Sequence, residues 1–144
     1  MGVLSYSALG AGWLSGKYRS GAASARPGSA ARASRPERFD TTLPANASKL
    51  TAVDALTELA AESGLTLVQL AIAFVVRHPA VTSAIIGPRT MDHLDGYLAA
   101  DGVELSSEVL DRIDQIVRPG TSVDAADNMW AVGTRGLDTL ARRR

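Results

Sequence analysis

A basic and a hydroxyl side chain, Arg89 and Thr90, follow directly after the apolar run 81–86 and the turn residues Gly87 and Pro88. Threonine is a favourable N-cap, and the first turn of a helix presents free backbone N–H groups and the positive end of the helix dipole. A strand, a tight turn and a capped helix in this order can therefore bind a phosphate. The same order is also ordinary α/β architecture without a ligand, so both interpretations stay open at this point.

A glycine-rich segment at 7–18 offers a second place for an anion. Its glycines permit close backbone approach to a ligand, while Ser7 and Lys17 supply a hydroxyl and an ammonium group. The segment is not a Walker loop, because Tyr18 stands where that loop requires Ser or Thr. It also lacks the third glycine of a Rossmann dinucleotide fingerprint. Both of these nucleotide-binding loops are therefore excluded.

No set of residues has the spacing of a known catalytic or metal centre. Paired carboxylates, a Ser-His-Asp order and a His-rich metal spacing are all lacking. His78 precedes Pro79 at the end of a predicted helix, where the helix dipole favours an imidazole for structural reasons. We therefore assign no catalytic residue and no metal ligand.

The composition predicts one globular unit without bulk charge. The chain has 144 residues, 46% of them hydrophobic, with 15 basic and 15 acidic residues. Zero net charge argues against nucleic acid and anionic membranes as partners. Cysteine is absent, which excludes disulfides and thiolate metal sites and favours a cytoplasmic location. No apolar run approaches the roughly 20 residues that span a bilayer.

Hydrophobic periodicity predicts alternating strands and helices around these segments. Both expected strands are short and apolar, and we expect both to be buried. The first should be buried on both faces, as in a parallel sheet. The expected elements are strands at 3–6 and 81–86 and helices at 48–62, 66–76, 90–100 and 106–117. Because a strand beginning at the initiator methionine is unusual, we expect that sequence upstream of it is missing.

Two stretches lack periodic apolar residues. The region 19–47 is rich in Arg, Ala, Ser and Pro and predicts a long surface loop, with Arg38 and Phe39 as anchors near its end. The region 119–144 predicts an irregular tail, with Trp130 as its one bulky anchor.

Two of the predicted helices have informative details. Ser48 is the expected N-cap of the first, which places Lys49 on its outer face. Thr66 and Gln69 form a capping box at the start of the second. That second helix is apolar on both sides, so we expect it to be covered on both sides.

The chain resembles the C-terminal portion of the aldo-keto reductases over residues 1–118. The motif Tyr-Ser-x-Leu-x-x-Gly-x-Leu-x-Gly-Lys-Tyr at 6–18 is similar to the segment after the seventh barrel strand of that family. The motif Ile-Ile-Gly-x-Arg-Thr at 85–90 and the helix after it resemble the eighth strand and the 2′-phosphate turn. The segments 70–79 and 105–116 resemble the family's helices before and after that strand.

This resemblance implies a (β/α)8 TIM barrel, of which the chain supplies the last two parallel strands with their helices. It also implies NADPH-dependent reduction of aldehydes and ketones by hydride transfer. A guanidinium suits a phosphate better than a ribose hydroxyl, so NADPH is favoured over NADH. By resemblance, Tyr6 stacks on the nicotinamide, Ser7, Leu9 and Lys17 lie along the pyrophosphate, and Gly87, Pro88 and Arg89 surround the 2′-phosphate.

The chain also departs from the family pattern. The family usually has Pro at Ala8, Gln at His93, an acid at Gly96 and Asn at Tyr97. Its catalytic Asp, Tyr, Lys and His lie upstream of the seventh strand, and none can be mapped onto this chain. A complete enzyme would reduce a small carbonyl substrate, whereas this chain is expected to be inactive alone.

Two alternatives to a reductase fragment stay open. One is a non-catalytic partner that completes a barrel with a separate N-terminal half, or that self-associates through its open strand edges. The other is an NADP(H)-binding remnant without chemistry. All the binding hypotheses require that the strands ending near Ser7 and Ile86 are neighbours whose outgoing turns face one ligand.

Overall fold

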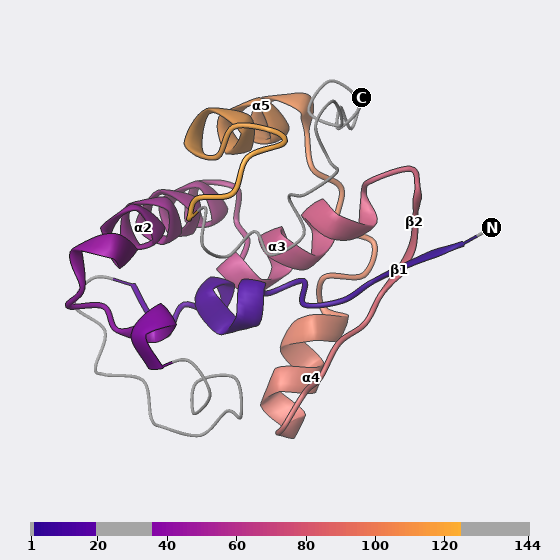
Figure 1. Cartoon of the computed structure of the whole chain (residues 1–144). Helices are drawn as coiled ribbons and strands as arrows, with labels where there is room; N and C mark the ends of the chain where they lie inside the picture. The colour runs from indigo at the N-terminus through magenta and orange to yellow at the C-terminus, as the bar shows by residue number, and fades with distance from the viewer. Residues whose placement is uncertain (1, 20–35, 125–144) are drawn as a thin grey trace.

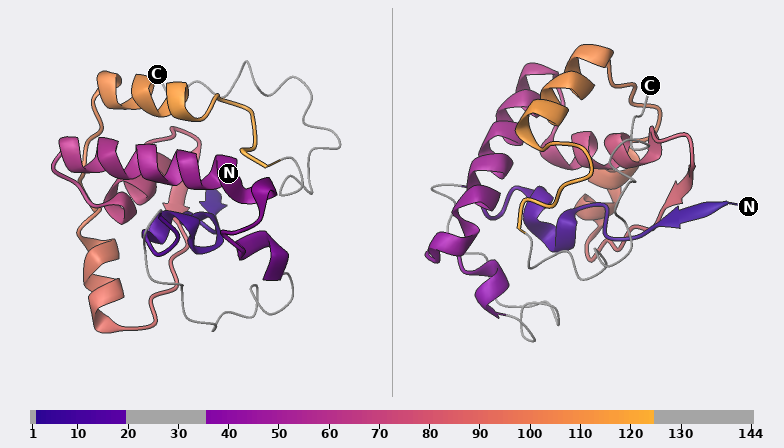
Figure 2. Two further views of the ribbon diagram at one scale, coloured as in Figure 1. Left: turned by 90° about the vertical axis from the view of Figure 1, so that its left-hand side faces the viewer. Right: turned by 45° about the horizontal axis from the view of Figure 1, so that its top comes forward.

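The computed structural model describes residues 2–19 and 36–124 and has an α/β fold (Figure 1). Helix α3 (Leu67–Val76) lies between α2 (Ala47–Glu62) and α5 (Ser107–Ile116) on one side and the two strands on the other, as Figure 1 and the right view of Figure 2 show. The elements in order are β1 (Val3–Ser5), η1 (Gly10–Ser15), η2 (Pro36–Phe39), η3 (Pro44–Asn46), α2 (Ala47–Glu62), α3 (Leu67–Val76), β2 (Val81–Ala84), α4 (Met91–Leu98) and α5 (Ser107–Ile116).

The two strands are parallel neighbours, as the sequence predicts. Ser5 pairs with Ala84 in the sheet, and the N–H of Ile85 donates to the Ser5 carbonyl at 2.7 Å just beyond the pairing. At the other end the register is irregular after Val3, whose N–H donates to Thr82 Oγ1 at 3.1 Å. Both strands therefore end at the same edge of the sheet, and their outgoing turns leave from that edge.

The prediction that both strands are buried is wrong for this chain. Leu4 is 64% exposed, Tyr6 72% and Ile85 55%. The physical reason is that two strands form a narrow ribbon, and α3 is the helix packed against β2. One helix covers one face, so the other face and the outer strand edges stay open among the described residues.

Helix α3 is apolar and is covered on both sides over most of its length, as predicted, but Val76 at its end is 42% exposed. The Thr66 hydroxyl accepts from the Gln69 N–H at 3.2 Å, and the Thr66 N–H donates to Gln69 Oε1 at 2.8 Å, which completes the predicted capping box. Leu70 packs into the cluster between α2 and α5, while Ile72 is buried on the side of β2 and α4. The helix therefore separates two parts of the molecule.

An aromatic cluster joins η1 to the start of α2. The ring centroids of Trp13 and Tyr18 lie 4.6 Å apart, and Phe39 stacks 5.9 Å from Tyr18. Phe39 is only 2% exposed, which confirms it as an anchor near the end of the predicted loop. This packing fixes the glycine-rich turn against the helical layer.

The described part of the predicted loop is not structureless. Residues 36–46 contain η2 and η3. Asn46 is 2% exposed, and its Nδ2 donates to the carbonyls of Glu37 and Asp40, both at 2.8 Å. Residues 20–35 of that loop lie outside the described residues. The predicted tail is irregular over 119–124, while 125–144, including Trp130, also lie outside.

The start of α2 differs from the prediction in two ways. The helix begins at Ala47, and Asn46 rather than Ser48 occupies the N-cap position, without a side-chain cap bond. Lys49 is not on an outer face, since it is only 6% exposed. Its ammonium group lies 2.7 Å from Asp124 Oδ2 and donates to Asn46 Oδ1 at 3.1 Å. These two partners compensate a buried charge that helical periodicity alone places in water.

Among the described residues, no single helix combines the length and apolar composition needed to cross a membrane. The segments Pro44–Glu62 and Leu67–Val76 meet those criteria only as a pair, across a bend of 91°.

Candidate functional site

The outgoing turns of both strands border one cavity of about 730 Å³. Five of the predicted site residues line it: Ser7, Leu9 and Lys17 from the first turn, and Gly87 and Arg89 from the second. The side chains of Val68 and Ile72 on α3 contribute an apolar floor. The two predicted segments, about 80 residues apart in the sequence, are therefore brought together at the edge where the strands end.

The structure does not bring Tyr6 and Pro88 to this cavity. Tyr6 is 72% exposed, and neither residue is among those that line the cavity. Their contacts with a ligand, like the roles of the five lining residues, remain predictions.

The backbone of the first turn is unusual because several residues have positive φ angles. Gly10 and Gly12 have φ values of 54° and 98°, and the non-glycine residues Ser7 and Ala11 have values of 60° and 57°. Such angles cost a non-glycine residue roughly 1–3 kcal/mol. The Ser7 hydroxyl accepts from the Ala11 N–H at 3.1 Å and holds this turn. The predicted hydroxyl is thus engaged in shaping the turn.

Lys17 reaches the cavity across the open position at Gly12. A Cβ atom added at Gly12 would lie 3.0 Å from Lys17 Nζ and 3.2 Å from Lys17 Cε. The ammonium group also lies 5.0 Å from the centroid of the Tyr18 ring, a cation–π distance. The missing side chain at Gly12 therefore provides the space in which the Lys17 ammonium group lies.

The second turn leads into α4 with the predicted cap. The Thr90 hydroxyl accepts from the His93 N–H at 3.2 Å, which confirms Thr90 as the N-cap. The helix covers residues 91–98 and is therefore shorter than the predicted helix at 90–100. His93 and Tyr97 lie one turn apart with ring centroids at 6.3 Å and planes at 9°, and both line the cavity. They add an aromatic wall beside Arg89.

This arrangement can bind an elongated anion with an apolar part. Lys17 and Arg89 bring two positive charges from separate turns, and the start of α4 adds partial positive charge. Asp92 in the first turn of α4 sets a negative charge near that helix end. Within the described ranges 2–19 and 36–124, no three His, Asp or Glu side chains gather as a metal site would require. The described residues of the site could therefore hold an anion through positive charge and through the shape of the cavity.

Sequence reasoning missed several of the residues that line this cavity. The glycine content of the segment does not single out Gly12, and helical periodicity gives the floor residues Val68 and Ile72 no role beyond an apolar helix. The spacing of residues in the sequence does not reveal the space that Gly12 leaves for Lys17, because this space depends on the fold of the turn. The positions of the floor residues follow from the docking of α3 on the sheet, which periodicity does not determine.

Known proteins are similar to this chain in sequence. The model of the aldo/keto reductase family matches residues 1–118. The chain is 39% identical over 114 residues to the proteins named Protein tas of Escherichia coli (strain K12) and of Shigella flexneri. Each match covers 79% of this chain and 31% of the relative, so the chain spans about a third of the length of these relatives. The chain belongs to the aldo/keto reductase family.

Proposed function

We propose that the chain is the nucleotide-binding part of an NADPH-dependent aldo/keto reductase, with the phosphates held in the cavity between η1 and α4. The observation that carries the proposal is that Lys17 and Arg89, from turns far apart in sequence, line one cavity of about 730 Å³. Family membership supports an oxidoreductase that uses NADP(H). A pyrophosphate and a 2′-phosphate are separate anions, which suits two separate cations.

The residues of the cavity fit such a cofactor. In the proposed arrangement, Ser7, Leu9 and Lys17 lie along the pyrophosphate, and the open position at Gly12 lets the backbone and the Lys17 ammonium group approach it. Glycine at positions of positive φ serves the same purpose in other phosphate-binding loops.

The 2′-phosphate lies against the turn formed by Gly87, Pro88 and Arg89. A guanidinium can donate two parallel hydrogen bonds to phosphate oxygens, which a ribose hydroxyl cannot accept in the same way. The stacked rings of His93 and Tyr97 offer a surface for the adenine. Tyr6 directly follows β1 and does not line the cavity, and in this proposal its exposed ring stacks on the nicotinamide outside the cavity.

Bound NADPH supplies a hydride to the carbonyl carbon of an aldehyde or ketone. In this proposal the residues of this chain bind and orient the cofactor, and no residue of the chain transfers the proton. The chain alone is expected to bind NADPH without turnover when an aldehyde is added. Steady oxidation of NADPH by the pure chain, followed by cofactor absorbance, would show that the proton donor lies within this chain after all.

The binding test compares NADPH and NADH by calorimetry with wild type and Arg89→Ala. Loss of a charged hydrogen-bond pair costs about 1.5–3 kcal/mol, so the variant should bind NADPH roughly 10- to 150-fold more weakly. The affinity for NADH should change little. Arg77→Ala is the matched control, because Arg77 is exposed at the end of α3 and does not line the cavity. Equal weakening for both nucleotides would contradict the assignment of Arg89 to the 2′-phosphate.

A second candidate function is assembly, favoured by the exposed sheet. Apolar side chains in and next to the strands are exposed, since Leu4 of β1 is 64% exposed and Ile85, which directly follows β2, is 55% exposed. The outer edge of each strand is unpaired among the described residues. Such edges and apolar faces are typical of surfaces that pair with further strands. Self-association, or completion of a barrel by an N-terminal half, would cover them.

A further inference from the structure

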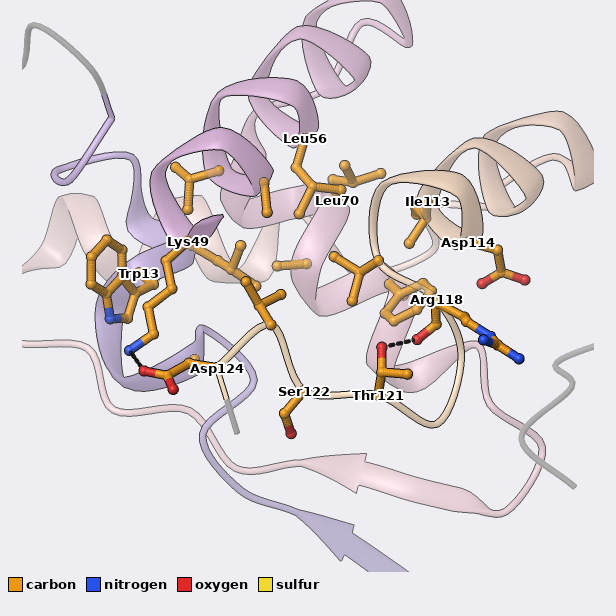
Figure 3. Close-up of a pocket in the computed structure, with 18 of the residues that line it drawn as sticks. Trp13, Lys49, Leu56, Leu70, Ile113, Asp114, Arg118, Thr121, Ser122 and Asp124 are labelled. Atoms are coloured by element: carbon orange, nitrogen blue, oxygen red, sulfur yellow. Dashed lines mark hydrogen bonds and ion pairs between the residues drawn. The ribbon is translucent and has the colours of Figure 1, made fainter. Parts of the chain in front are cut away.

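A second cavity lies on the opposite face of α3 from the nucleotide cavity. Its volume is about 440 Å³, within the roughly 300–1,000 Å³ range of small-molecule sites. Apolar side chains of α2, α3 and α5 line most of it, among them Leu56, Leu70 and Ile113 (Figure 3). The segment 117–124 crosses its open side. The two cavities share η1 and α3 but no lining residue.

One end of this apolar cavity carries a buried ammonium group. The side chain of Lys49 is 7% exposed, and its Nζ lies 2.7 Å from Asp124 Oδ2 (Figure 3). Nζ also lies 5.6 Å from the centroid of the Trp13 ring. A buried cation in apolar surroundings requires a negative partner, and here the end of the crossing segment supplies it.

Trp13 points to an acceptor that the described residues do not supply. Its indole Nε1 is buried and has no hydrogen-bond partner in the part of the chain that the structure describes. Trp13 is 6% exposed and lines the cavity, and Figure 3 shows its nitrogen on the side of the Lys49 ammonium group. A buried N–H without a partner costs about 1–3 kcal/mol, which a ligand oxygen would recover.

The charges around the cavity favour an anion. Three cationic side chains line it, Arg38, Lys49 and Arg118, against two carboxylates, Asp114 and Asp124. The formal excess is one positive charge, and it rises to two if the Asp124 carboxylate moves away from the cavity. The segment that carries Asp124 has no helix or strand between 117 and 124, and Thr121 Oγ1 donates to the Arg118 carbonyl at 2.6 Å.

We propose that this cavity binds a small organic carboxylate with an apolar body. The ligand carboxylate takes the place of the Asp124 carboxylate on Lys49 Nζ and accepts the hydrogen bond of Trp13 Nε1. Its apolar body lies among the side chains of α2, α3 and α5. Asp124 is thus an internal competitor for the ligand's head group, and the site is independent of the nucleotide cavity.

The test measures octanoate binding to the full chain by calorimetry, with 1-octanol as the uncharged probe of equal length. Wild type is expected to bind octanoate and to bind 1-octanol at least about tenfold more weakly, because the alcohol lacks the charge. Asp124→Asn removes the competitor, so it should bind octanoate roughly tenfold more tightly than wild type. Lys49→Met should lose octanoate binding by a similar factor or more.

A cavity-filling variant provides a control that does not touch the charges. Ala52→Leu adds side-chain volume to the wall formed by α2 and should weaken octanoate binding while NADPH binding stays unchanged. Circular dichroism melts check that each variant is folded. If Lys49→Met does not fold, the octanoate affinities of Asp124→Asn and Ala52→Leu still test the proposal. Absence of octanoate binding to wild type and Asp124→Asn would overturn the proposal, as would equal binding of 1-octanol or weaker octanoate binding by Asp124→Asn.

Discussion

Gly12 is the residue on which the position of Lys17 depends. Its φ of 98° strains any L side chain, and a Cβ there would meet Lys17 Nζ at 3.0 Å. Gly16 has a similar φ of 81°, but a Cβ added there would meet nothing within 4 Å. The pair therefore separates backbone strain from crowding of the ammonium group.

We predict that Gly12→Ala and Gly16→Ala both lower the free energy of unfolding by roughly 1–2 kcal/mol, because each places a Cβ at positive φ. Only Gly12→Ala should also weaken NADPH binding, by displacing Lys17. Urea unfolding and calorimetric titration of the two variants measure both effects. Equal NADPH affinities in the two variants would mean that the Lys17 position does not matter for binding.

At the residue scale, the sequence identifies which side chains could bind an anion, but it does not predict whether a side chain is buried or exposed. Arg89 and Lys17 were found because a cation beside a turn or a glycine-rich segment is a visible pattern, and the structure places both at one cavity. Helical periodicity predicts a solvent-exposed Lys49, because it describes one helix without its tertiary neighbours. Its partner Asp124 is 75 positions away, and no local rule connects them.

The start of α2 shows how an element's boundary depends on tertiary contacts. Ser48 has the right chemistry for an N-cap, yet Asn46 ties the helix to η2 through hydrogen bonds to two carbonyls and accepts from Lys49. Asn46 is 2% exposed, so these hydrogen bonds are shielded from water.

We predict that Asn46→Ala lowers the free energy of unfolding by about 2–4 kcal/mol, because buried hydrogen-bonding groups lose their partners. Ser48→Ala, the matched control two residues further along the chain, should change this free energy by less than about 0.5 kcal/mol. Urea unfolding of both variants tests this. A larger effect for Ser48 would restore the cap that the sequence suggested.

An ion pair joins the end of α2 to α5. Arg112 donates a hydrogen bond to Glu62, and this bond and the nearby positive charge hold the pKa of the Glu62 carboxyl below its ordinary value of 4.5. A carboxyl whose pKa is lower in the folded state contributes stability above its unfolded pKa and loses it as the pH falls through its folded pKa.

We therefore predict that wild type is slightly more stable than Glu62→Gln at pH 7, and that the difference disappears as the pH falls from about 5 to about 3. Thermal melts across this range measure it. The pair is exposed, so salt of about 1 M should shrink the difference at pH 7 as well. A difference that grows on acidification would have the wrong sign for this ion pair.

Element order was predictable because each helix carries its own apolar stripe, and α3, α4 and α5 also carry their own start signals. Thr66, Thr90 and Ser106 each accept a hydrogen bond from the backbone N–H three residues later, as their types predict. The loop 19–47 was predicted less well. Its Pro and Ala content hides η2 and η3, whose order comes from the burial of Phe39 and Asn46.

At the scale of the whole molecule, the exposed sheet is the main departure from expectation. The strand sequences have the composition of buried strands, but Leu4, Tyr6 and Ile85 are more than half exposed. Burial of a strand depends on what lies beside it, which its own sequence does not state. The barrel that we expect from the resemblance would account for this composition, because each strand of a closed barrel lies between neighbours on both sides.

We predict that the pure chain self-associates through this sheet, because burying apolar surface is favourable by about 25 cal/mol per Å². Sedimentation equilibrium should show a mass that rises with concentration. Leu4→Asp and Ile85→Asp should each shift the equilibrium toward the monomer. Leu43→Asp, at a residue 37% exposed between η2 and η3, is the control that should not. A wild-type chain that stays monomeric at all concentrations would contradict assembly through the sheet.

In the proposed function, two turns, one after each strand, bind the same nucleotide. The most direct measurement is a titration with NADP⁺ followed by backbone amide resonances in NMR spectra. We expect the amides of Ala11 and Gly12 in the first turn to shift together with those of Arg89 and Met91 in the second, with one shared dissociation constant. Shifts confined to one turn, or two different constants, would contradict it.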